Sequence, residues 1–231
     1  MSATKAQRSY EVEIKSLLGS KENADKLKKD MQKAYPSAKL ISQGKQLNHY
    51  FNIPSDLAPL IKNLDPLIPA SKKQEFEHIL SHGQKISLRT RDADGKVILV
   101  IKASVGGDTS SNGVKRVEFE SVVKDSLDIL DKVILAAGCT YQAKWSRERE
   151  EYEADGMHIC IDKNAGYGYL AEFERVISDD SRLEETRMEL LSAMERLGAV
   201  ELAQDRLERM FAHYNAHWQE YYGTEKTFTV Q

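Results

Sequence analysis

Charged residues at alternate positions of predicted strands are the feature of this sequence that points most directly to chemistry. Glu11, Glu13 and Lys15 alternate with apolar residues in the segment 10–15, so on a β-strand the three charges share one face. Carboxylate pairs supply the oxygen ligands that Mg²⁺ and Mn²⁺ prefer, and interleaved lysine and arginine suit phosphate. Because the same arrangement recurs along the chain, it predicts a sheet closed around a charged, ligand-binding interior.

The same alternation returns in later segments. Arg89 and Arg91 share one face of a predicted strand over 85–92, and the apolar run of the next strand, 96–104, ends in Lys102. Since an apolar strand of this kind is buried on both faces, its lysine needs a partner or a ligand. The other charged residues that share strand faces are Arg116, Glu118, Glu120, Arg147, Arg149, Asp162, Glu172 and Glu174.

Taken singly, each charged pair is explained by a solvated strand face or by a cross-strand salt bridge. Glu75, Glu77, Glu148 and Glu150 also occur two residues apart, and they are predicted to lie outside the interior. The order of the groups goes beyond what salt bridging requires. It runs through an acid pair with lysine, an arginine pair, a lysine, an arginine with an acid pair, a second arginine pair, an aspartate and a last acid pair.

The composition limits the class of protein. With 231 residues, 41% hydrophobic and 30% charged, the chain is expected to form one domain over residues 1–222, with an insertion at 56–82 and a loose tail at 223–231. The formal net charge of −3 argues against a protein that binds nucleic acid through bulk positive potential. Any phosphate chemistry must therefore come from a local group of residues.

The sequence also predicts the compartment. No segment is apolar over the length of a membrane span, and the first residues lack the apolar region of a secretion signal. Cys139 and Cys160 are too few for a disulfide framework and lack metal-ligand spacing, so both are expected to be reduced. These features predict a cytoplasmic protein without a membrane partner and leave its oligomeric state open.

Apolar alternation and turn residues predict about eight strands and several helices. The strands are expected at 8–18, 39–53, 85–92, 96–104, 114–123, 140–153, 157–163 and 168–177. A hairpin through Gly44 is an alternative for the second of them. The helices are expected at 20–35, 74–80, 126–137, 182–197 and 204–222. Strands with helices inserted between them favour an α+β protein with a mainly antiparallel sheet or barrel.

The order of the charged motifs resembles the triphosphate tunnel metalloenzyme superfamily, also called the CYTH family. The family opens on a strand reading E-x-E-x-K, which corresponds here to 11–15. Its R-x-R strand corresponds to 89–91, its next lysine to Lys102 and its R-x-E-x-E strand to 116–120. The match continues through the rest of the family pattern and covers most of the chain.

The later motifs follow in the same order. The basic strand that ends R-x-x-Y corresponds to 149–152, with Arg147 two residues earlier. The final aspartate, Gly-rich turn and E-x-E correspond to Asp162, 166–168 and 172–174. Two segments depart from the pattern: the insertion is longer than a compact member needs, and the C-terminal helix matches the family's basic/Tyr segment only loosely.

The resemblance implies a closed antiparallel β tunnel of about eight strands, with helices outside and a triphosphate-containing small molecule as substrate. Burying such a polyanion is costly unless each oxygen is paired. The implied phosphate-binding residues are Lys15, Arg89, Arg91, Lys102, Arg116, Arg147 and Arg149. The implied ligands of Mg²⁺ or Mn²⁺ are Glu11, Glu13, Asp162, Glu172 and Glu174. The residues expected to carry catalysis are Glu11, Glu13, Lys15, Glu118 and Glu120.

Some roles and the reaction itself stay open. Glu118 and Glu120 could bind a second metal, orient water or anchor the arginines. Metal-dependent hydrolysis is favoured because it needs only the triphosphate site. The alternatives are a class IV adenylyl cyclase, which also needs a purine pocket, and a non-catalytic sensor, against which the retained carboxylates argue. The aromatic residues that could stack an organic head group, or simply pack in a core, are Tyr50, Phe51, Trp145 and Tyr167.

Overall fold

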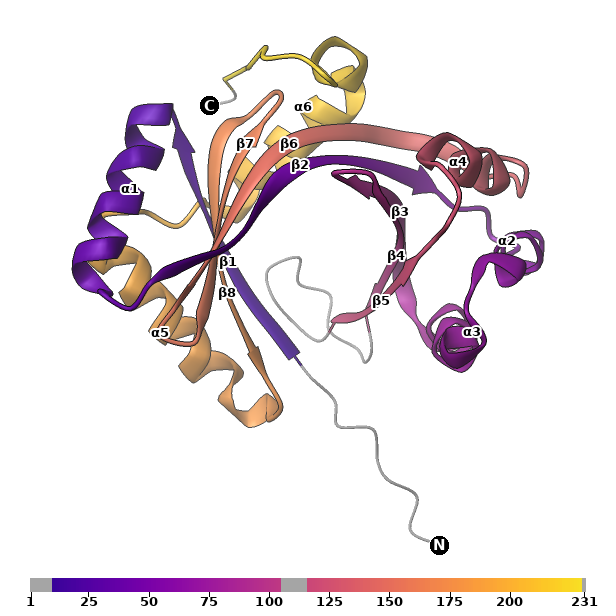
Figure 1. Cartoon of the computed structure of the whole chain (residues 1–231), viewed down its shortest axis with the longest axis horizontal. Helices are drawn as coiled ribbons and strands as arrows, with labels where there is room; N and C mark the ends of the chain where they lie inside the picture. The colour runs from indigo at the N-terminus through magenta and orange to yellow at the C-terminus, as the bar shows by residue number, and fades with distance from the viewer. Residues whose placement is uncertain (1–9, 105–115, 230–231) are drawn as a thin grey trace, which may run out of the picture.

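The computed structural model describes residues 10–104 and 116–229. Its main feature is an antiparallel sheet of eight strands in the order β1-β8-β7-β6-β2-β3-β4-β5, which curls around a concave face (Figure 1). The strands are β1 (Tyr10–Gly19), β2 (Lys39–Asn52), β3 (Gln84–Ala93), β4 (Lys96–Ser104), β5 (Arg116–Val122), β6 (Thr140–Ala154), β7 (Met157–Asn164) and β8 (Gly168–Ile177).

Helices lie on both flanks of the sheet, with α1 and α5 beside β1 and β8, and α2, α3 and α4 beside β3, β4 and β5 (Figure 1). The α-helices are α1 (Lys21–Ala34), α2 (Ala58–Leu64), α3 (Lys73–His82), α4 (Leu127–Leu135), α5 (Leu183–Arg196) and α6 (Gln204–Tyr221). Short 3-10 helices are η1 (Asp65–Leu67), η2 (Ala70–Lys72) and η3 (Asp180–Arg182). The α+β class predicted from the sequence is therefore confirmed.

Most elements begin and end where the sequence predicts. Helix α1, for example, begins after Ser20, whose side chain accepts a hydrogen bond from Asn23 N at 3.3 Å. The alternative of a hairpin through Gly44 is wrong, because β2 is one continuous strand in which Gly44 pairs with Arg149 of β6. The predicted insertion, 56–82, forms α2, η1, η2 and α3.

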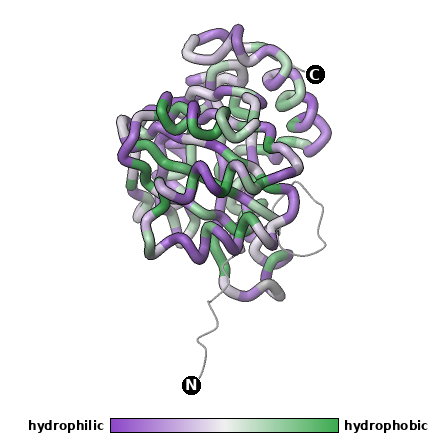
Figure 2. Tube along the Cα trace, turned by 90° about the vertical axis from the view of Figure 1, so that its right-hand side faces the viewer, coloured by the Kyte–Doolittle hydropathy of each residue, from purple (hydrophilic) through white to green (hydrophobic). Residues whose placement is uncertain are grey.

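The alternation of residue types along the strands decides which face each side chain occupies. On β1, Val12 and Ile14 are buried against the helices, whereas Glu11, Glu13 and Lys15 are half-buried on the concave face. Figure 2 shows hydrophobic and hydrophilic residues alternating along the chain trace. The alternation of residue types along the strands therefore produces a polar concave face and an apolar outer face.

Two hydrophobic cores join the outer face of the sheet to the helices. Leu27 of α1, Leu190 of α5 and Phe173 of β8 belong to one buried cluster. Phe76 of α3 and Phe119 of β5 belong to the other, with 5.6 Å between their ring centroids. Complete burial of a side chain of this size stabilises the fold by about 1.5–3 kcal/mol, so the helices hold the curvature of the sheet firmly.

The two edges of the sheet, β1 and β5, do not pair with each other in the described part of the chain. The predicted closed tunnel is therefore not confirmed, and the described sheet is open. The edges still approach each other, because Lys102 Nζ of β4 lies 3.5 Å from Glu11 Oε2 of β1. Strand alternation specifies the face of each residue but not whether the last strand pairs with the first.

Helix α6 covers one end of the concave face. Met210 and Tyr214 of α6 are buried with Leu170 of β8, which has the same strand parity as Glu172. Tyr214 Oη also donates a hydrogen bond to the carbonyl oxygen of Lys144 at 2.8 Å. This helix thus contacts the interior of the curled sheet, whereas the resemblance implied helices on the outside only.

The described part of the C-terminal tail is bound to the turn between β7 and β8. Gly166 N–H donates to the carbonyl of Lys226 at 2.8 Å, and Phe228 N–H donates to the carbonyl of Gly166 at 2.8 Å. The ring of Phe228 lies 5.3 Å from that of Tyr167. The described part of the tail thus contacts the domain through Lys226 and Phe228.

None of the helices in the described ranges has the length and apolar character needed to cross a membrane. Cys139 and Cys160 are both buried and free.

Candidate active site

The charged residues predicted from strand alternation come together on the concave face. They lie on every strand except β2, and each one whose side chain is described interacts with at least one other. The backbone of Arg116 pairs with Ser104 of β4, but its side chain lies outside the described part of the structure. Motifs that are far apart in the sequence thus form one cluster in space.

Two lysines neutralise acids near the β1 edge. Lys15 contacts Glu13 on its own strand, and its Nζ lies 3.4 Å from Glu172 Oε1. Lys102 Nζ lies 3.5 Å from Glu11 Oε2 across the gap between the sheet edges. Because these side chains are partly buried, salt screens the pairs less than it screens surface pairs.

Asp162 is fully buried and anchors two arginines. Its Oδ2 accepts hydrogen bonds from Arg147 Nη1 at 2.8 Å and Arg149 Nη2 at 2.7 Å, and its Oδ1 accepts from Arg149 Nε at 2.7 Å. Arg149 also contacts Glu172. Burial alone would raise the pKa of Glu172, but Lys15 and the two arginines outweigh burial and hold it well below its usual value. To bind a metal, Asp162 would first have to release a guanidinium group.

Glu11 and Glu174 form the carboxylate pair that best suits a divalent cation. Burial, together with the charge and hydrogen bond of Glu11, raises the pKa of Glu174 to about 7. Two crowded carboxylates are stabilised by a shared proton or by a cation, and Mg²⁺ and Mn²⁺ prefer such oxygen ligands. The donor chemistry therefore fits the implied metal, with Glu13 and Glu172 nearby on the same two strands. In the described ranges, Asp, Glu, His and Cys side chains do not already form a coordination shell.

The strand β2 supplies neutral partners for three of the arginines. The donor and acceptor pairs are Arg147 Nε to Gln46 Oε1 at 2.9 Å, Arg91 Nε to Asn48 Oδ1 at 3.1 Å, and Arg89 Nη1 to Tyr50 Oη at 2.8 Å. Gln46 and Asn48 are missing from the predicted set, because neutral side chains add nothing to a charge pattern. Their spacing at alternate positions of one strand is the signal that could have revealed them.

Glu118 and Glu120 both pair with bases. Glu118 Oε2 lies 3.0 Å from Lys102 Nζ, and its Oε1 accepts from Arg89 Nη2 at 3.4 Å. Glu120 Oε1 accepts from Arg91 Nη1 at 3.1 Å. Burial alone would raise the pKa of Glu118, but Lys102 and Arg89 outweigh burial and lower it. Of the three roles left open for these acids, anchoring the basic residues is the one that the contacts support.

The four glutamates predicted to lie outside the interior do so. The side chain of Glu148 is 52% exposed, and Glu150 Oε1 accepts a hydrogen bond from Lys28 Nζ of α1 at 3.1 Å. Glu75 and Glu77 are exposed on α3. The predicted register of β6, with its two arginines on the concave face, is therefore confirmed.

The four aromatic residues considered as a stacking surface lie in different places. Phe51 is buried in the outer core, and the ring of Trp145 stacks on Tyr214 of α6 at a centroid distance of 3.7 Å. Tyr167 packs against Trp145 at 5.0 Å. Only Tyr50 contacts an arginine of the charged cluster. Core packing thus accounts for the other three.

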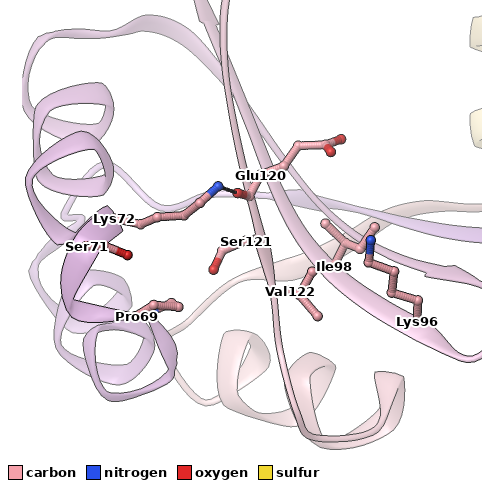
Figure 3. Close-up of a pocket in the computed structure, with 8 residues that line it drawn as sticks. All are labelled: Pro69, Ser71, Lys72, Lys96, Ile98, Glu120, Ser121 and Val122. Carbon is pink, nitrogen blue, oxygen red and sulfur yellow. Dashed lines mark hydrogen bonds between the residues drawn. The ribbon is translucent and has the colours of Figure 1, made fainter.

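A separate hollow of about 310 Å³ lies beside the free edge of β5 (Figure 3). Lys72 of η2 donates from Nζ to the main-chain carbonyl of Glu120 at its wall. The hollow is lined by Pro69, Ser71, Lys72, Lys96, Ile98, Glu120, Ser121 and Val122. It meets the charged cluster only at Glu120, whose carboxylate binds Arg91, so it is distinct from the site on the concave face.

With the fold and the charged cluster in place, the class of protein follows. The chain belongs to the CYTH domain family, whose model matches residues 9–206. The match spans every charged motif described above, so the family predicted from motif order is confirmed.

Solved structures share the fold at low sequence identity. The PH1012 protein from Pyrococcus horikoshii OT3 is 18% identical with a TM-score of 0.58, covering 84% of this chain and 92% of that one. The PH1819 protein from the same organism is 18% identical with a TM-score of 0.59, covering 84% and 94%. A candidate adenylate cyclase from Vibrio parahaemolyticus is 14% identical with a TM-score of 0.58, covering 88% and 98%. A comparison with curated proteins finds no match.

Proposed function

We propose that this CYTH-family protein is a metal-dependent phosphohydrolase that acts on a triphosphate-containing small molecule bound at the concave face. The observation that carries the proposal is the gathering of basic side chains and acid pairs on one partly buried surface. The basic members are Lys15, Arg89, Arg91, Lys102, Arg147 and Arg149. A buried polyanion requires such surroundings, and CYTH proteins bind triphosphate substrates.

The arginines supply directed phosphate contacts. A guanidinium group presents paired N–H donors that match two phosphate oxygens, whereas a lysine acts as a compact charge. Glu118 and Glu120 hold terminal nitrogens of Arg89 and Arg91, and a phosphate would take over those donors. Asp162 keeps its arginines oriented during this exchange because both of its oxygens bind them from within the sheet.

The acids at the β1 and β8 edge are the proposed metal ligands. Glu11, Glu13, Glu172 and Glu174 would hold Mg²⁺ or Mn²⁺, with Asp162 as a further ligand only after release of an arginine. When bound, the cation supplies charge neutralisation at the phosphate oxygens. In the structure, the ammonium group of Lys15 lies between Glu13 and Glu172. If a cation neutralised these carboxylates, Lys15 would be available to bind a phosphate oxygen.

In addition to this arrangement, hydrolysis needs only a water molecule that attacks the phosphorus as the bond to the leaving phosphate breaks. Phosphoryl transfer requires little covalent chemistry, so positioning and charge neutralisation carry most of the catalysis. A cyclase would also need a purine pocket, and Trp145 and Tyr167 are packed against α6 rather than open to a base. A sensor could bind phosphate through the basic residues alone, and would have no use for the crowded Glu11 and Glu174 pair.

A substrate panel tests the proposal. Inorganic triphosphate, thiamine triphosphate and ATP are incubated with the protein and Mg²⁺ or Mn²⁺, and the products are identified by ³¹P NMR. Orthophosphate release that stops on chelation with EDTA is the expected result. Cyclic AMP with pyrophosphate would instead establish a cyclase, and binding without any product would establish a sensor. Full activity after exhaustive chelation would contradict the metal dependence.

A further inference from the structure

The concave face of β2 carries a row of neutral polar side chains between two strands that carry arginines. β2 lies between β3 and β6 in the sheet, and Gln46, Asn48 and Tyr50 occupy alternate positions along it. Each of them is the direct cross-strand partner of an arginine. These backbone pairs are Gln46 with Arg147, Asn48 with Arg91, and Tyr50 with Arg89.

Each of these arginines is held from two sides by chemically different groups. On Arg91, Nε donates to the neutral oxygen of Asn48 at 3.1 Å, while Nη1 donates to the carboxylate of Glu120 at 3.1 Å. On Arg147, Nε donates to Gln46 at 2.9 Å, while Nη1 donates to Asp162 at 2.8 Å. In both arginines, the neutral side chain therefore binds Nε, and the terminal nitrogens remain available for other partners.

We propose that Gln46 and Asn48 are positioning residues that orient two phosphate-binding guanidinium groups, those of Arg147 and Arg91, without cancelling their charge, a role that rests on the function proposed above. An incoming phosphate competes with Glu120 for the terminal nitrogens of Arg91, while the contact of Arg91 to β2 stays in place. A carboxylate on β2 would hold the arginines equally well but would weaken their attraction for a polyanion.

The outer face of the same three strands is fixed by one buried carboxylate. Asp131 of α4 accepts hydrogen bonds from Thr90 of β3 and Tyr141 of β6, each at 2.7 Å, and its Oδ2 lies 2.6 Å from His49 Nδ1 of β2. His49 alternates with the positioning residues on β2, and Thr90 separates the two arginines of β3. Because these hydrogen bonds join the three strands on their outer face, they keep the donors and acceptors on the concave face in register.

The test uses one chemical change at two positions of β2. Gln46→Glu keeps an acceptor oxygen but adds a negative charge beside Arg147. Gln43→Glu makes the same change at an exposed position of the same strand and serves as the matched control. Affinity for inorganic triphosphate is measured by calorimetry in EDTA, so that no turnover occurs and the basic residues are tested without metal.

We expect Gln46→Glu to weaken triphosphate binding about tenfold or more, the scale of one lost charge-assisted contact, and Gln43→Glu to change it less than about twofold. Equal affinities for the two variants, or wild-type affinity in Gln46→Glu, would overturn the inference. Absence of binding by the wild-type chain would overturn it as well, and the ³¹P assay would then decide separately whether the proposed function also fails.

A second measurement tests the contacts without any ligand. The Nε–H protons of Arg91 and Arg147 should exchange slowly with water in ¹⁵N-resolved NMR spectra, because each is bound to a partly buried amide oxygen. Asn48→Leu should speed exchange at Arg91 only, and Gln46→Leu at Arg147 only, with the melting temperature as a folding control. Fast exchange at both sites in the wild-type chain would overturn the positioning role regardless of the substrate.

Discussion

Two buried aspartates lie on opposite faces of the same sheet, and each accepts several hydrogen bonds, but from different kinds of side chain. Asp131, on the outer face, binds the uncharged donors Thr90 and Tyr141 together with His49. Asp162, on the concave face, receives three hydrogen bonds from two arginines. Both side chains are almost completely buried.

The two aspartates differ in the charge of the groups that bind them. The oxygens of Asp131 bind Thr90, Tyr141 and His49, and His49 Nε2 in turn lies 2.7 Å from Tyr222 Oη. Around Asp162, two arginines bind two carboxylates, Asp162 and Glu172, and Lys15 also lies beside Glu172. A network of hydroxyl and imidazole groups around one acid stabilises the fold, whereas one that contains three basic side chains can also bind an anion. The first region is therefore structural and the second is suited to binding.

The largest effect is expected when the Asp162 network is broken. Asp162→Asn leaves two partly buried guanidinium groups without their main counterion. Removing one partner of a buried ion pair costs about 3–5 kcal/mol of stability, and the freed arginines should also lose the orientation needed for kcat/KM. Urea unfolding and steady-state kinetics measure the two losses. A variant as stable as the wild type would show that the arginines are satisfied by other groups.

The next effect separates the two faces of the sheet. Arg89→Ala should lower kcat/KM for triphosphate by about 1.5–3 kcal/mol in activation free energy, the scale of a lost hydrogen bond to a charged group. Glu148→Ala, on the exposed side of β6, is the control and should change kcat/KM little. Circular dichroism verifies the fold of both variants. Comparable losses in the two would show that the assignment of faces is wrong.

Breaking the outer network should cost stability more than function. Asp131→Asn replaces one acceptor oxygen with a donor beside His49 and Tyr141, which costs about 1–3 kcal/mol. The free energy of unfolding should fall by that amount while triphosphate affinity stays within a few-fold of the wild type. A loss of affinity as large as that of Asp162→Asn would remove the distinction between the two networks.

The pH dependence of stability sharpens the same point. Burial alone would raise the pKa of Asp131, but the hydrogen bonds from His49, Tyr141 and Thr90 outweigh burial and lower it. A carboxyl group with a lowered folded pKa contributes stability that is present above its unfolded pKa, about 3.9, and is lost as the pH falls through the folded value. The stability difference between wild type and Asp131→Asn should therefore shrink as the pH falls below about 5. A constant difference over this range would contradict the lowered pKa.

The smallest expected effect concerns one hydroxyl group. Thr90→Val keeps the shape of the side chain but removes its hydrogen bond to Asp131, which costs about 1 kcal/mol of stability. Because Thr90 points away from the concave face, KM for triphosphate should not change. A changed KM with unchanged stability would place Thr90 in the binding machinery instead.

Strand alternation made the concave face predictable and left the outer network hidden. Charges at every second residue assign Glu13, Arg91 and Arg149 to one face without any knowledge of their neighbours. Asp131, in contrast, is one acid within a helix, and its partners lie on three different strands, two of these partners more than 40 residues away in the sequence. Its position four residues after the buried Leu127, on the apolar side of α4, is the only local signal of burial.

The features that differ from prediction all depend on which segments meet. Sequence periodicity does not determine whether β1 pairs with β5, and in the described residues it does not. The packing of α6 against Leu170 and the binding of Phe228 to Gly166 require contacts that no local pattern encodes. Neutral acceptors such as Asn48 also remain hidden until the arginines are seen to donate to them.

The most direct test of the binding role of the concave face is the shift in melting temperature caused by saturating inorganic triphosphate with Mg²⁺. A ligand at 100 times its Kd stabilises the folded state by about 2.7 kcal/mol, so the wild type should melt at a clearly higher temperature. Asp131→Asn should show the same shift at the same ligand concentration, and Asp162→Asn a smaller one, because its arginines have lost the orientation that binding needs. An unmoved wild-type melting temperature would contradict a triphosphate-binding role for the concave face.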